Sequence, residues 1–147
     1  MLERQSALQS ALRLRPPGLL GTTDHQNADV HLAEHRLGAL VQISAFAQST
    51  DTAGEILADL VHLPLPEKCR FTGNATAQLS LIGPGTWLLS DDDNALPNAA
   101  TLRTALRGHA TVVDLSHART AFRLSGPAAI RTLAKFCSLD LAGSAFP

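Results

Sequence analysis

The sequence of 147 residues contains no tyrosine, one tryptophan and only two cysteines. So few aromatic rings argue against a sugar-binding platform or a stacking surface for single-stranded nucleic acid. The two cysteines, Cys69 and Cys137, form no CxxC pair, and they make neither a disulfide framework nor a zinc site. These shortages argue against the small proteins that depend on metal or disulfide staples.

An excess of charge of either sign is also missing, since 12 Lys and Arg residues balance 13 Asp and Glu residues and the net charge is −1. A general binder of nucleic acid or of anionic membranes normally has a basic excess, so we expect neither partner. No apolar stretch reaches the length of a membrane span, and the start at Met1–Ser6 lacks the apolar run of a signal peptide. We therefore expect a cytoplasmic protein.

Hydrophobic residues make up 45% of the chain and charged residues 17%, a composition that predicts a folded core. We expect a loosely packed arm at 1–30, with a short helix at 6–14, followed by a single domain at 31–147. The elements expected in that domain are, in chain order, a strand at 39–46, a helix at 52–62, strands at 78–82 and 86–90, a helix at 98–107, strands at 111–115 and 120–124, and a helix at 126–137.

Local signals predict where the first of these elements begin and end. Thr52 and Glu55 fit a capping box at the start of the first helix, and Pro64 and Pro66 close it. Gly83-Pro84-Gly85 predicts a type II turn between two paired strands, because proline presets the second turn position and glycine permits a positive φ at the third.

The last third of the chain repeats the opening order of strand, helix and extended tail. Ser125 is expected to cap the last helix, whose apolar face would consist of Ile130, Leu133, Ala134 and Cys137. Two such units, the second incomplete, predict an α+β fold in which helices cover one face of a largely antiparallel sheet. By the offset between the copies, the second unit would end roughly 35 residues beyond the last residue of this chain.

The pattern H-x-x-E-H occurs at His31, Glu34 and His35 and matches an inverted zinc-protease motif. On a helix the two histidines would share a face and hold Zn²⁺, with Glu34 as the base. A third ligand is needed, and Glu55 and Glu67 are the glutamates that follow. The favoured alternative is a polar entry to the first strand.

Asp114, Ser116 and His117 supply the three residue types of a catalytic triad close together in the sequence. In an extended strand Asp114 and Ser116 point one way and His117 the other, so the base does not reach the nucleophile. We favour a polar turn in which Asp114 and Ser116 satisfy local backbone donors, with Arg119 as a partner for Asp114.

Further patterns have a weaker link to chemistry. The acidic run at 91–94 lacks the spacing of a calcium loop and is expected to be solvated. The turn at 83–85 lacks the third glycine of a dinucleotide-binding fingerprint. Residues 125–127 could hold an anion at a helix start, but an ordinary helix start is favoured. Cys137 could be a reactive thiol, but a core thiol is favoured. Trp87 is expected in the core or in an interface.

Three blocks of the sequence resemble the gamma subunit of heterotetrameric sarcosine oxidase. Residues 113–129 are similar to its V-D-x-S-x-x-R-T and L-S-G-P-x-A stretch, residues 83–89 to its G-P-x-x-W-L-L, and residues 137–147 to its C-P-L-D-L and A-F-P. Ser138 stands where the family usually has proline. The D-x-S and G-P-x-A pieces also occur in the wider folate-dependent aminomethyltransferase superfamily. Because the family continues beyond A-F-P, the resemblance implies a gamma subunit truncated at its C-terminal end.

The resemblance implies a non-catalytic assembly subunit that has no catalytic, cofactor-binding or metal-binding residue of its own. Its implied partners are the alpha, beta and delta subunits. These would carry FAD, FMN, NAD and tetrahydrofolate. They would oxidise sarcosine, or a related N-methyl amino acid, to glycine with release of hydrogen peroxide and one-carbon transfer to folate.

Two alternatives stay open beside this resemblance. The first is a free-standing folate-binding or aminomethyl-transfer protein, for which Asp114 is the carboxylate candidate. The second is a zinc hydrolase that uses His31, Glu34 and His35.

Overall fold

The computed structural model of the chain describes residues 28–35, 37–67 and 70–141. The expected arm at 1–30 lies mostly outside these residues, and the expected helix at 6–14 lies wholly outside them. None of the helices in the described ranges is long and apolar enough to cross a membrane.

Internal contacts divide the chain into two compact units, one of Met1–His35 with Thr120–Pro147 and one of Arg36–Arg119. The sequence predicts a different division, an arm at 1–30 and one domain at 31–147, and this division stays a prediction. The two units are described separately below.

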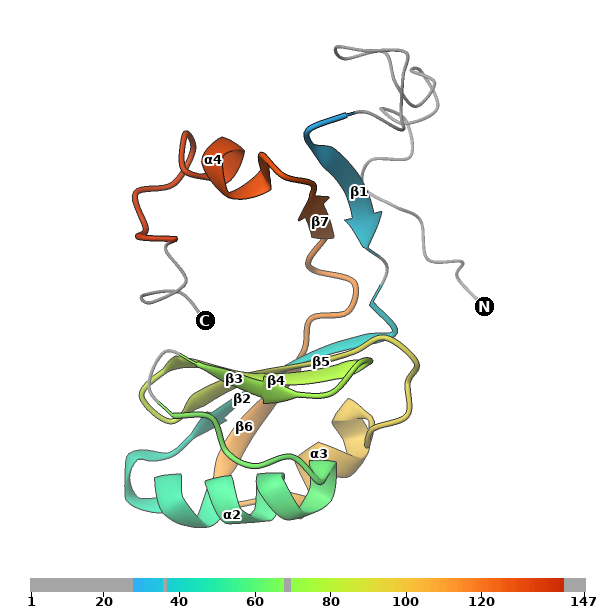
Figure 1. Cartoon of the computed structure of the whole chain (residues 1–147). Helices are drawn as coiled ribbons and strands as arrows, with labels where there is room; N and C mark the ends of the chain where they lie inside the picture. The colour runs from blue at the N-terminus through green and yellow to red at the C-terminus, as the bar shows by residue number, and fades with distance from the viewer. Residues whose placement is uncertain (1–27, 36, 68–69, 142–147) are drawn as a thin grey trace. The chain divides into compact units, whose positions relative to one another are not determined.

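A five-stranded antiparallel sheet with the strand order β3-β4-β5-β2-β6 forms the unit of Arg36–Arg119. Both longer helices, α2 and α3, lie on one face of this sheet (Figure 1). The predicted α+β class with antiparallel strands is therefore confirmed. The elements of this unit are β2 (Ala39–Ala45), η1 (Ala47–Ser49), α2 (Thr50–Val61), β3 (Phe71–Gly73), β4 (Ala77–Gly83), β5 (Thr86–Asp91), α3 (Ala99–Ala105) and β6 (Ala110–Asp114).

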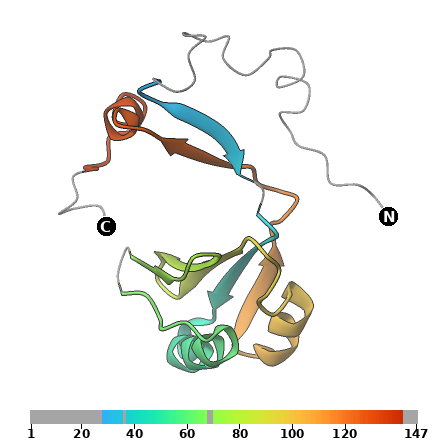
Figure 2. The ribbon, with the colours of Figure 1, turned by 45° about the vertical axis from the view of Figure 1, so that its right-hand side comes forward.

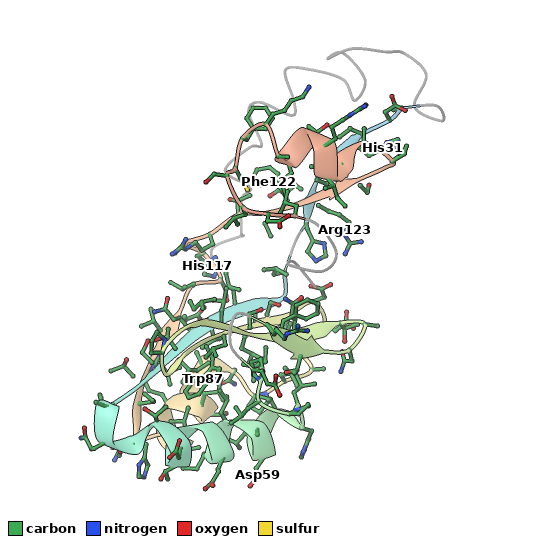
Figure 3. All side chains as sticks on the ribbon, turned by 60° about the vertical axis from the view of Figure 1, so that its left-hand side comes forward. His31, Asp59, Trp87, His117, Phe122 and Arg123 are labelled. Carbon is green, nitrogen blue, oxygen red and sulfur yellow. The ribbon has the colours of Figure 1, made fainter. Side chains whose placement is uncertain are left out.

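The core of this unit lies between the sheet and the two helices. Strand alternation sends every second side chain to the helical side, as Val41 and Ile43 of β2 show with exposed fractions of 2% and 0%. Trp87 of β5 is 4% exposed, which confirms its expected place in the core. A Cβ added at Gly54 of α2 would lie 3.6 Å from Cζ2 of Trp87, so the indole packs directly beneath this helix. Figure 3 shows Trp87 on the sheet side of α2 and Asp59 on its outer side.

Helix α2 begins earlier than the capping box predicts, and this prediction is wrong. The chain is already helical at Thr50, because the short η1 turn leads directly into α2, and Ser49 makes no side-chain cap. Thr52 therefore lies inside the helix. At the other end His62 adopts a left-handed φ of 53°, which stops the helix before Pro64 is reached.

The hairpin of β4 and β5 has the predicted turn. Pro84 and Gly85 separate the two strands, and Gly85 has a φ of 60°, in the left-handed region that favours glycine. The following helix α3 is capped by Asn98, whose Oδ1 accepts hydrogen bonds of 3.0 Å from the backbone amides of Ala100 and Thr101.

In its described residues, 28–35 and 120–141, the unit of Met1–His35 with Thr120–Pro147 contains a two-stranded antiparallel ribbon and one short helix. The ribbon pairs β1 (His31–His35) with β7 (Ala121–Ser125), and α4 (Ala129–Leu133) follows β7. The two strands run side by side in both views (Figure 1, Figure 2).

The helix predicted at 126–137 is wrong in its extent, because α4 has only five residues. Ser125 is not its cap but pairs with His31 in the ribbon. Gly126 has a φ of 107°, so the chain turns away after β7, and the Ala128 amide donates a 3.0 Å hydrogen bond to the Asp29 carbonyl. Helical geometry therefore starts only after this turn.

We predict that Leu57→Ala destabilises the Arg36–Arg119 unit by about 2–5 kcal/mol, because Leu57 is 0% exposed and its truncation leaves a cavity between α2 and the sheet. Urea denaturation followed by the fluorescence of Trp87 measures this loss. Glu55→Ala on the exposed side of α2 is the control and is expected to change stability by no more than about 0.5 kcal/mol. Equal effects of the two variants would contradict the described core.

Candidate functional site

The turn that follows β6 joins this edge strand to β2 through Asp114 and Ser116. The Ser116 amide donates a 2.9 Å hydrogen bond to Oδ1 of Asp114. The Ser116 hydroxyl oxygen accepts a 3.0 Å hydrogen bond from the Leu40 amide, and the Leu115 amide donates to the Leu40 carbonyl at 2.8 Å. Both backbone groups of Leu40 are thus satisfied where the β2–β6 ladder ends, which confirms the interpretation of a polar turn.

Hydrogen bonds from the side chain and the backbone amide of Ser116 hold the pKa of Asp114 below its usual value. The charges of His117 and Arg103 act in the same direction, and the slight burial of the carboxylate opposes them. The charged neighbour from another element is thus Arg103 of α3, and not Arg119 as the sequence predicts. The Ser116 hydroxyl contacts both backbone groups of Leu40, at 3.0 Å from its nitrogen and 3.5 Å from its oxygen, so the cluster holds the turn against β2.

The H-x-x-E-H pattern lies in strand β1, so the helix that a zinc site would need is absent here. In a strand His31 and His35 point to one face and Glu34 to the other. The motif therefore does not bring its three side chains together. The described residues contain no cluster of three or more His, Cys, Asp or Glu side chains that could hold a metal ion.

The acidic run at 91–94 differs from the solvated loop that the sequence predicts. Asp91 belongs to β5 and is 1% exposed, because it follows Trp87 and Leu89 on the buried side of the strand. Its two carboxylate oxygens accept hydrogen bonds from the amides of Asp93, at 3.1 Å, and Leu96, at 2.7 Å. Asp91 therefore organises the loop. The alternation within β5 was the signal that could have revealed its burial.

The remaining candidates from the sequence are the glycine turn at 125–127 and the two cysteines. Gly126 allows the chain to pass close to the backbone of Asp29, since a Cβ there would lie 2.5 Å from the Asp29 carbonyl oxygen. Cys137 is half-buried and lies beyond the end of α4, so it is not part of a helical core face. Cys69 lies outside the described residues.

The surface feature that stands out is a group of exposed apolar side chains in the unit of Met1–His35 with Thr120–Pro147. The sequence pattern does not reveal it, because helical spacing places Ile130 and Leu133 on an apolar helix face without showing whether that face is covered. These two are 64% and 42% exposed, and the apolar side chains of the ribbon and of the segment after α4 are exposed as well. The further members are Leu32 at 68%, Phe122 at 50%, Phe136 at 83% and Leu139 at 63%.

Large apolar side chains that gather on one face are typical of a surface that further polypeptide, of the same chain or of another, covers. The register of the ribbon puts Leu32 opposite Leu124 and Glu34 opposite Phe122, so Leu32, Phe122 and Leu124 share one face. Figure 3 shows Phe122 and Arg123 on opposite sides of β7. We call this face, with Leu32, Phe122 and Leu124, the apolar ribbon face.

Comparison with solved structures finds a similarity to a chain of a known enzyme. No family model matches the chain, and no curated protein matches it. The structure is similar to a chain of the heterotetrameric sarcosine oxidase from Corynebacterium sp. U-96, solved in complex with pyrrole 2-carboxylate, with a TM-score of 0.70 and 30% sequence identity. The match covers 80% of the present chain and 60% of that chain. The resemblance to sarcosine oxidase is thereby confirmed at the level of the enzyme.

We predict that Asp114→Ala lowers stability by about 1 kcal/mol, because the exposed carboxylate loses its hydrogen bonds with Ser116. Since the pKa of Asp114 is lowered in the folded chain, its contribution is present above about pH 4 and is lost as the pH falls through the lowered pKa. Thermal unfolding of both proteins between neutral pH and about pH 2 should therefore show a difference that shrinks in acid.

Asp93→Ala is the matched control, since Asp93 is an exposed acid in another loop. A difference between Asp114→Ala and the unchanged chain that persisted at the lowest pH would contradict this account.

Proposed function

We propose that this chain is the gamma-type assembly subunit of a heterotetrameric sarcosine oxidase. The observation that carries the proposal is the similarity to a sarcosine oxidase chain, at a TM-score of 0.70 and 30% identity over 80% of the chain. The three sequence blocks at 83–89, 113–129 and 137–147 support the gamma subunit in particular.

The side chains that resemble catalytic groups support a structural role. Asp114, Ser116 and Asp91 all bind backbone amides of this chain, and each of these bonds closes a turn or a strand end. In the proposed complex the alpha, beta and delta subunits hold the flavins, NAD and tetrahydrofolate and perform the oxidation. The proposed contribution of the present chain is a docking surface that holds those subunits together.

The substrate proposed for the complex is sarcosine or a related N-methyl amino acid. Its demethylation would produce glycine and hydrogen peroxide and would pass the one-carbon unit to tetrahydrofolate. A free-standing folate-binding protein is the alternative function, and titration of the isolated chain with tetrahydrofolate distinguishes the two. Saturable binding by the isolated chain would favour the alternative.

We predict that the tagged chain, co-expressed with the alpha, beta and delta subunits of a sarcosine oxidase, co-purifies with them as one complex. That complex should release hydrogen peroxide on addition of sarcosine, whereas the isolated chain should bind no flavin and show no oxidation. Omission of the chain should greatly reduce the amount of assembled complex while turnover per bound flavin stays near normal.

Size-exclusion chromatography combined with flavin absorbance measures both assembly and cofactor content. The proposal would be overturned if a fully active complex formed without the chain and if the tagged chain, when it was present, eluted alone. The Asp114→Ala variant adds a second readout. Complex that assembles fully but turns over a hundredfold more slowly would assign Asp114 to chemistry.

A further inference from the structure

We draw no further inference here: the strongest candidate, the face of the five-stranded sheet opposite α2 and α3, on which Phe71 of β3 and Val113 of β6 are each 49% exposed, carries nothing because nothing in the structure shows what covers it.

Discussion

Burial of one face of the five-stranded sheet beneath α2 and α3 is the interaction on which the rest of this unit depends. Strand β2 lies between β5 and β6, which follow it much later in the chain, so its ladders close long loops. Such closure costs conformational entropy, and the gain from removing Ile43, Trp87 and Leu57 from water offsets it. Asp91 and the Asp114–Ser116 turn then complete the strand ends with hydrogen bonds to backbone amides.

The same alternation of apolar and polar residues has a different outcome in the β1–β7 ribbon. Within residues 28–35 and 120–141 of that unit, the apolar ribbon face is not covered by a helix long enough to bury it, since α4 has only five residues. A face of this kind is stable when further strands or helices complete the layer. Among its described residues this unit therefore buries far less apolar surface than the unit of Arg36–Arg119.

The contrast between the two units is relevant to the similarity with a sarcosine oxidase chain. The present chain spans 60% of the length of that chain, and the similarity concerns an enzyme composed of several subunits. Acidic and hydroxyl side chains that elsewhere serve catalysis are bound here to the backbone. Exposed leucine, isoleucine and phenylalanine side chains occur on the ribbon, on α4 and in the segment after it.

The sequence by itself determined the fold class and the β4–β5 turn, because these depend on periodicity and on the local conformational preferences of proline and glycine. The tertiary structure decided what the local patterns could not. Ser125 has the chemistry of a helix cap, yet pairing with His31 keeps it in a strand and delays α4. Asp91 is acidic and followed by two further acids, yet its position in β5 buries it where two backbone amides need an acceptor. Whether Ile130 and Leu133 face a core depended on which elements pack against them, and helical spacing alone does not contain that information.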